Sequence, residues 1–221
     1  MENIPQKFVR FLNKYPLRKF RKNQTLLFQG EVPSYAYFIK SGIVKAYNIT
    51  SNGDEQIIAL NSAGDIVPAA WILGEAPVAY YFYEAFVDCE VFIIPRSDLS
   101  KMIDEDNELT RMMLRRFIRL YSGSRMHINA LEQPKSRDKL IHLMYYLMTR
   151  FGEPSGKLMK VNLRLTHQTL ANMIGVTRET IAVELSQLRR EKVVSYRQQI
   201  YSINKSKLME LRNEEELAID I

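Results

Sequence analysis

The sequence contains few of the residues that several common protein chemistries require. Cys89 is the one cysteine in 221 residues, which excludes an intrachain disulfide framework and the roughly four thiolates of an iron–sulfur cluster. The three histidines, His127, His142 and His167, are scattered along the chain and form no metal-ligand pairing. We therefore expect neither a metal nor a cofactor.

The sequence also lacks a long apolar run. No stretch of about 18 uncharged apolar residues is present, so a membrane span is not expected. Residues 1–15 mix both charge signs and have no apolar core of the signal-peptide kind. We therefore expect a cytoplasmic protein with no membrane partner. No Ser/His/Asp set, phosphate loop or isolated carboxylate pair stands out, so we do not expect an enzyme.

Positive charge is concentrated in one half of the chain. The net charge is +6, divided as −3 over residues 1–108 and +9 over residues 109–221. A basic half beside a mildly acidic half is typical of a protein that brings one domain to a polyanion. Taken alone, the pattern is equally consistent with a solvated basic surface.

The first half of the chain has the pattern of a β-rich domain. Phe8, Phe11, Leu12 and Tyr15 predict a short amphipathic helix that ends before Pro16. Short runs rich in β-branched and aromatic residues follow, separated by Gly, Pro, Asn and Asp. These predicted strands cover residues 25–28, 35–39, 43–49, 56–60, 80–86 and 90–94. Many short strands with regular turns favour a β-roll or barrel.

Residues 107–133 predict one long helix. A heptad-like seam runs along it, formed by Met113, Phe117, Leu120, Ser124, His127 and Leu131. Two interpretations remain open: a two-fold dimer interface, or a helix packed only on its own chain. The segment 133–136, which contains Pro134, predicts a hinge after this helix.

Residues 163–203 predict a winged helix-turn-helix. Thr166 and Thr177 are each placed to cap a helix, and Gly175 provides the flexible backbone of the turn between the two helices. Leu170, Ala171 and Ile174 share one face of the first helix. Ile181, Leu185 and Leu188 share the inner face of the second, which covers residues 177–190. Residues 193–196 and 200–203 predict the wing hairpin.

Several motifs carry a resemblance to a known family. The helix-turn-helix Thr-x-x-x-Leu-Ala-x-x-Ile-Gly-x-Thr-Arg-Glu-Thr-Ile, from Thr166 to Ile181, resembles that of the cyclic-AMP receptor protein/Fnr (Crp/Fnr) family. The glycine-punctuated segments around Gly30, Gly42, Gly53 and Gly64 resemble the cyclic-nucleotide-binding-type β-roll of the same family.

The resemblance implies an α+β fold in three parts. These are a β-roll sensor domain over residues 1–106, a dimerisation helix over residues 107–133, and a winged helix-turn-helix DNA-binding domain over residues 134–221.

The resemblance also implies DNA contacts. Arg178 and Glu179 are the expected base-reading pair, with Ala182 and Val183 beside them in the groove. Val183 replaces an arginine of the cyclic-AMP receptor, so we expect a different operator preference. The expected phosphate contacts are Thr166, His167, Gln168, Thr177, Thr180, Arg197 and Gln199. For His167, an ordinary exposed helix position is an equally good interpretation.

The sensory half departs from the cyclic-nucleotide binders of that family. Pro68 and Ala69 occupy the Gly-Glu positions of the phosphate motif, and no Arg or Lys occurs between Lys45 and Arg96. A cyclic phosphate would therefore lose its charge-assisted hydrogen bonds, so we predict that cyclic AMP is not the effector. The candidate pocket residues are Trp71, Tyr80, Tyr81, Tyr83, Ser124 and His127. The alternative is that the aromatic members form β-roll core and His127 is a tolerated seam residue.

The sequence therefore predicts a homodimeric transcription regulator that binds double-stranded DNA at a palindromic site. RNA polymerase is a further partner if the regulator is an activator, and an unidentified small-molecule effector is allowed. The alternative is a small-molecule sensor or interaction protein with nonspecific nucleic-acid binding.

Overall fold

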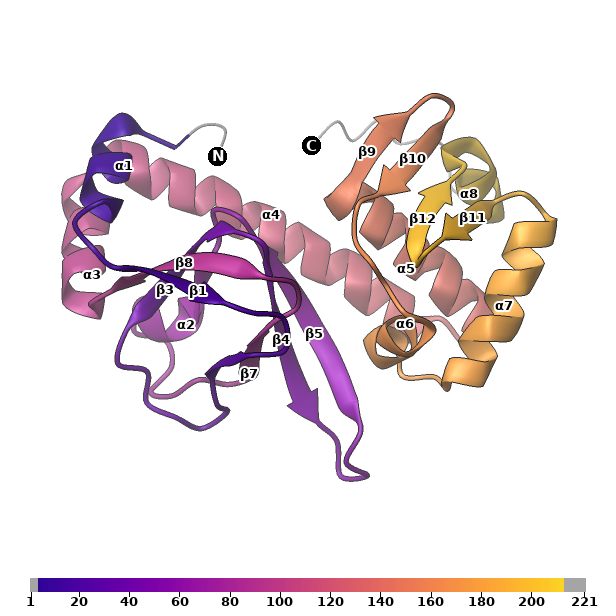
Figure 1. Cartoon of the computed structure of the whole chain (residues 1–221), viewed down its shortest axis with the longest axis horizontal. Coiled ribbons are helices and arrows are strands. Elements are labelled where there is room, and N and C mark those ends of the chain that lie inside the picture. Colours follow the sequence, from indigo (N-terminus) through magenta and orange to yellow (C-terminus); the bar gives the residue numbers. More distant parts are fainter. Residues whose placement is uncertain (1–3, 213–221) are drawn as a thin grey trace. The chain divides into compact units, whose positions relative to one another are not determined.

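A computed structural model of the chain describes residues 4–212 (Figure 1). Contacts group the chain into an N-terminal unit and a C-terminal unit, divided between Leu120 and Tyr121. The first unit is rich in strands, whereas helices dominate the second. The predicted α+β class is confirmed. Residues 213–221, at the end of the predicted DNA-binding domain, lie outside the described residues.

The N-terminal unit alternates short strands with tight turns and ends in helices. Its elements are α1 (Gln6–Leu12), β1 (Leu17–Phe20), β2 (Thr25–Leu27), β3 (Ala36–Ser41), β4 (Ile43–Ile49), β5 (Glu55–Ser62), β6 (Ile66–Val67), α2 (Ala69–Ile72), β7 (Phe82–Ala85), β8 (Cys89–Ile94), α3 (Arg96–Glu105) and the start of α4 (Asn107–Glu132).

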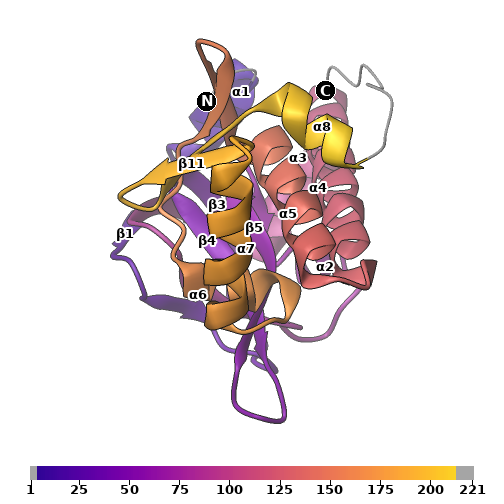
Figure 2. The ribbon, with the colours of Figure 1, turned by 90° about the vertical axis from the view of Figure 1, so that its right-hand side faces the viewer.

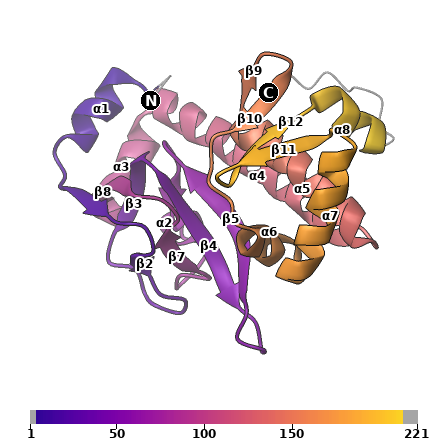
Figure 3. The ribbon, with the colours of Figure 1, turned by 45° about the vertical axis from the view of Figure 1, so that its right-hand side comes forward.

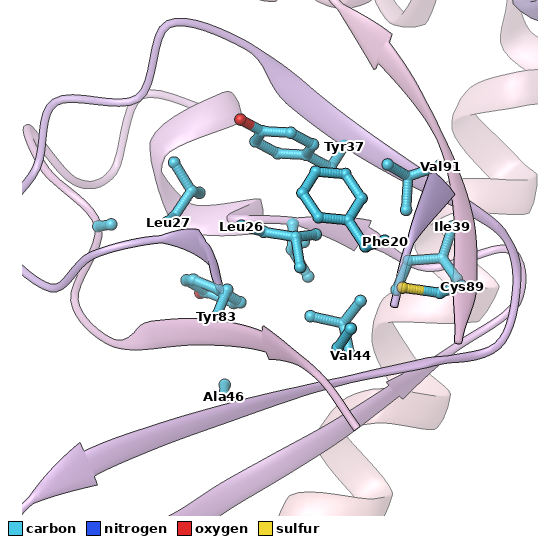
Figure 4. Packing of buried hydrophobic residues seen from close by; sticks show 13 residues of the cluster. Phe20, Leu26, Leu27, Tyr37, Ile39, Val44, Ala46, Tyr83, Cys89 and Val91 are labelled. Carbon is cyan, nitrogen blue, oxygen red and sulfur yellow. The ribbon is translucent and has the colours of Figure 1, made fainter. Parts of the chain in front are cut away.

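Two four-stranded antiparallel sheets build the β-roll, in the orders β1-β8-β3-β6 and β2-β7-β4-β5. The β4–β5 hairpin is the longest pairing and is seen side-on in Figure 3. Side chains of both sheets, among them Tyr37, Ile39, Val44 and Tyr83, form one buried cluster (Figure 4). Alternation along each strand sends these apolar residues inward, so the roll interior is a packed core.

A second core joins the helices of this unit to the outer face of the roll. Phe8 and Leu12 of α1 pack with Trp71, Leu99 and Leu109. The amphipathic helix predicted at the N-terminus is therefore confirmed. Helix α4 begins at a cap, because Oδ1 of Asp106 accepts hydrogen bonds from the backbone amides of Glu108 and Leu109, each at 3.0 Å.

The C-terminal unit is a helical domain with one small sheet. Besides the end of α4, its elements are α5 (Ser136–Phe151), β9 (Gly152–Ser155), β10 (Leu158–Val161), α6 (His167–Ile174), α7 (Arg178–Arg190), β11 (Val194–Arg197), β12 (Ile200–Ile203) and α8 (Lys205–Arg212). The sheet order is β11-β12-β10-β9. Leu140, Leu143 and Leu147 of α5 are buried, and α5 packs against both α6 and α7.

The predicted seam of α4 needs correction. Met113 packs against the helical core of its own unit, and His127 is 5% exposed within the C-terminal unit. The large apolar side chains that α4 exposes are Leu114, Phe117, Ile118, Tyr121 and Ile128, which we call the α4 stripe. One residue of offset rotates a helix face by about 100°. Phe117 belongs to both sets, whereas Met113 and His127 face the chain's own core.

Candidate nucleic-acid interface

Two helices and a glycine turn form the helix-turn-helix. Thr166 Oγ1 accepts a hydrogen bond from the Thr169 amide at 3.0 Å, and Thr177 Oγ1 accepts from the Thr180 amide at 3.1 Å. Gly175 has φ of 65° and ends α6 in the left-handed region, where a residue without Cβ is favoured. Both predicted caps and the predicted glycine turn are confirmed.

Helix α7 has one buried face and one exposed face. Ile181, Leu185 and Leu188 are each 0% exposed, which fixes α7 against α5 and α6 (Figure 2). The exposed face carries Arg178, Glu179, Ala182, Val183 and Ser186. The four residues expected to read bases therefore lie together and project away from their own domain.

The wing is a two-residue hairpin. Strands β11 and β12 pair from Val194 with Ile203 to Arg197 with Ile200. Gln198 and Gln199 form the turn, with φ of 51° and 67°, as a tight hairpin loop of type I′ requires. The Gln199 carbonyl accepts a hydrogen bond from the Leu165 amide at 2.9 Å, which ties the wing tip to the segment before α6.

Tyr196 of the wing contacts both helices of the helix-turn-helix, through His167 of α6 and Arg189 of α7. The His167 ring makes an edge contact with Tyr196 at 5.8 Å between centroids, and the Arg189 guanidinium lies 5.8 Å from the same tyrosine ring. Burial lowers the pKa of His167 below its ordinary value, and the charge of Arg178 lowers that pKa further. His167 is therefore a neutral imidazole near pH 7 in the free protein.

The wing carries groups that the sequence pattern did not single out. A hollow of about 420 Å³ is lined by Lys160, Ser195 and Ser202 together with Arg197. Lys160 comes from β10, which pairs with β12, so strand pairing brings it beside the wing. A lysine and hydroxyl groups beside Arg197 fit phosphate oxygens. The sequence alone does not mark Lys160 as a candidate phosphate contact, because its place beside the wing depends on the pairing register of β10 and β12.

Within the N-terminal unit, the aromatic candidate effector residues are divided between the two cores and the surface. Trp71 belongs to the helical core, whereas Tyr83 belongs to the roll interior with Tyr81 packed against it. Tyr80 is 48% exposed.

The two polar candidates belong to the C-terminal unit, where Ser124 is exposed and His127 is buried. His127 Nε2 lies 2.6 Å from the Met173 carbonyl oxygen, and its ring stacks on Tyr146. These are the contacts of a core residue.

Two further features of the described residues concern membrane spans and metal sites. In the described chain, no helix has the length and apolarity to cross a membrane. Among residues 4–212, no group of three or more His, Cys, Asp or Glu side chains is arranged to hold a metal ion.

A β-roll followed by a long helix and a winged helix-turn-helix with an exposed polar recognition face defines a DNA-binding transcription regulator. Residues 17–106 match the cyclic nucleotide-binding domain, and residues 138–211 match the Crp-like helix-turn-helix domain. The chain belongs to the Crp/Fnr family of transcription regulators, as its motifs predicted.

Sequence relatives agree with this assignment, and solved structures share the fold. The chain is 27% identical over 187 residues to the global nitrogen regulator of Nostoc sp. (strain PCC 7120), covering 84% of each chain. It is 29% identical over 195 residues to the fumarate and nitrate reduction regulatory protein of Vibrio cholerae, covering 88% of this chain and 77% of the relative.

The fold resembles a CooA mutant from Carboxydothermus hydrogenoformans, with a TM-score of 0.78, 19% identity and 96% coverage of both chains. It also resembles FixK2 from Bradyrhizobium japonicum, with a TM-score of 0.73, 22% identity and coverage of 89% and 96%.

Proposed function

We propose that the chain acts as a homodimer whose two recognition helices read the halves of a palindromic DNA site. The observation that carries this proposal is the exposed α7 face, where Arg178 and Glu179 project beside Ala182 and Val183. A guanidinium donates two bonds to guanine O6 and N7, and a carboxylate accepts from the cytosine amino group. In a two-fold dimer, the second helix would lie about one helical turn (roughly 34 Å) away.

Val183 supports an operator that differs from the one read by an arginine at this position. It is 57% exposed on the recognition face and has no donor or acceptor. An isopropyl group packs against a thymine methyl, so we expect an A·T pair at this step. The candidate phosphate contacts Thr166, His167, Gln168, Thr177, Thr180, Arg197 and Gln199 surround the face and would fix its register on the duplex.

The α4 stripe supports dimerisation. Its five large apolar residues recur at helical spacing and are each about half exposed, from 49% to 57%. Exposed apolar side chains are unfavourable in water, and pairing the stripe with that of a second copy would bury them. RNA polymerase would be a further partner of an activator built in this way.

Cyclic AMP is not the effector in this proposal. Pro68 is buried at one phosphate-motif position, and Ala69 has no polar side chain at the next. Arg96 is the first cation after Lys45 in the sequence, but its Nε donates to the Ile72 carbonyl at 3.2 Å and its guanidinium lies over Trp71. A cyclic phosphate in the roll would need a cation and amide donors of its own.

Selection from random duplex DNA by the purified full-length chain tests this function. We expect enrichment of one two-fold motif. The competing function is a sensor or interaction protein that holds nucleic acid only through its basic half, with net charge +9 over residues 109–221. That function predicts strongly salt-dependent binding without an enriched motif.

A further inference from the structure

A pocket of about 250 Å³ lies within the N-terminal unit, between the turn after β5, helix α2 and the first half of α4. Ile72 and Leu73 line it from the α2 segment, Ile103 from α3, and Met113 and Phe117 from α4. These walls are almost entirely hydrocarbon. The pocket therefore suits an apolar group.

This pocket is separate from the interior of the β-roll. Tyr37, Val44 and Tyr83 fill that interior (Figure 4), and none of them lines the pocket. Trp71, Tyr80 and Tyr81, which the sequence placed in the candidate effector cluster, do not line it either. The pocket is thus a different place from the one indicated by the sequence.

The apolar lining holds two charged side chains, Arg116 and Asp65, and the charge of Asp65 acts on the Arg116 guanidinium. Arg116 lies against the turn at Gly64, where an added Cβ would meet the guanidinium carbon at 2.2 Å. Nη1 of Arg116 donates to the Ala63 carbonyl at 3.3 Å, but its buried Nε has no hydrogen-bond partner among the described residues. A buried donor of a charged group without a partner is costly. The pocket thus has apolar walls and one end with an unused donor.

We propose that this pocket binds a small amphipathic monocarboxylic acid, with its hydrocarbon body between α2 and α4 and its carboxylate on Arg116. A carboxylate would supply the acceptor that the Arg116 Nε lacks and would share the guanidinium with the nearby charge of Asp65. The pocket shares Leu114 and Phe117 with the α4 stripe, so a second copy paired along the stripe would cover these two residues. An apolar side chain of that copy inside the pocket would leave the Arg116 donor unsatisfied. The unused donor therefore favours an acid over the second copy.

Titration of the purified full-length chain with octanoate, octanol and octylamine tests the proposal by calorimetry. We expect saturable binding of one octanoate per chain, with octanol at least about tenfold weaker because it lacks the charge-assisted bond, and octylamine not bound. Arg116→Gln should reduce octanoate affinity to that of octanol and leave octanol binding unchanged. Retained octanol binding would show that the pocket is still folded.

Two further variants serve as a blocked pocket and as a matched control. Ala69→Phe places a large side chain at the wall and should abolish binding of both octanoate and octanol. Arg115→Gln removes an exposed arginine of α4 that does not line the pocket, and it should bind octanoate like the parent.

Equal octanoate affinity in the parent, Arg116→Gln and Ala69→Phe proteins would overturn the proposal, as would no saturable binding. Binding that appears only after Ile118→Lys disrupts self-association would identify a second copy as the occupant and would also overturn it.

The acid would touch Met113 and Phe117 of α4, the helix proposed to pair two copies on DNA. A role of the acid in DNA binding would therefore rest on the proposed function. The two failures are distinguishable. Loss of octanoate binding with an intact enriched DNA motif contradicts the acid site alone. Octanoate binding without any enriched motif contradicts the DNA function alone.

Discussion

Nε2 of His127 lies 2.6 Å from the backbone carbonyl oxygen of Met173, which joins the second half of α4 to the first helix of the helix-turn-helix. The imidazole also stacks on Tyr146 of α5, with centroids 5.4 Å apart. The last turns of α4 are thus part of the core that supports α6. A histidine in this position supports α6 on the side that faces the core of its own unit.

Replacing His127 by leucine tests this contact. Leucine keeps the bulk but leaves the buried Met173 carbonyl without this donor, so the free energy of unfolding should fall by roughly 1–3 kcal/mol. Denaturant unfolding of the full chain measures the change. Arg125→Ala, at an exposed position two residues away, is the control and should change stability by less than about 0.5 kcal/mol. Equal effects of the two variants would contradict a structural role for His127.

The α4 stripe gives a second prediction. Ile118→Lys places a charge in the middle of five exposed apolar residues, so the proposed dimer should dissociate to monomers at micromolar concentration. Sedimentation equilibrium measures the mass. Arg115→Gln lies about 100° away around the helix from the stripe and should stay dimeric. A parent chain that is monomeric at every concentration would contradict the proposed assembly.

Cys89 gives a third prediction. Its side chain is 3% exposed, and burial, assisted by the charge of Asp88, raises the pKa of the thiol to about 11. The thiolate is the reactive form, so at pH 8 the native protein should react with a thiol reagent only through unfolding. The reaction rate should rise by several orders of magnitude in denaturant. Rapid labelling of the native protein would show that the roll core opens at Cys89.

His167 gives a fourth prediction, in which pH is the variable. Because its pKa lies below the ordinary value, the imidazole is neutral near pH 7 and gains a proton as the pH falls below about 6.5. The added charge would strengthen a phosphate contact, so DNA affinity should increase from pH 7 to pH 5.5.

His167→Gln should lose this increase, whereas the parent keeps it. An identical pH slope in the two proteins would remove His167 from the interface. The depressed pKa also has a consequence for folding. The unfolded chain binds the proton more tightly, so the His167 contribution to stability decreases as the pH falls through about 6.5.

The helix-turn-helix could be predicted from the sequence because its signals are local. Thr166, Gly175 and Thr177 act on their own turns through caps and a left-handed residue, and the inner positions of α7 recur at helical spacing. Most β-roll strands were predicted for the same reason. The strand β9 was not, because it contains Pro154 and exposes most of its residues, and proline is tolerated there only because β9 is an edge strand.

The remaining features depend on contacts between distant residues. Arg116 reaches Gly64 across 52 positions, and nothing near Arg116 in the sequence marks it as different from the other arginines of α4. His127 reads as a seam residue in a heptad pattern, whereas the fold turns it toward Met173. Periodicity in the sequence predicts that a helix has an apolar face. Which part of the molecule that face packs against depends on the tertiary structure.

The most direct test of base reading combines variants of the protein with variants of its enriched DNA site. Affinities are measured for the parent and Arg178→Ala chains, each on the parent site and on sites with one base pair exchanged. We predict that Arg178→Ala costs roughly 1–3 kcal/mol on the parent site and removes the preference at one base pair per half-site, leaving the others intact. A uniform loss on every site, or an unchanged preference, would contradict the account.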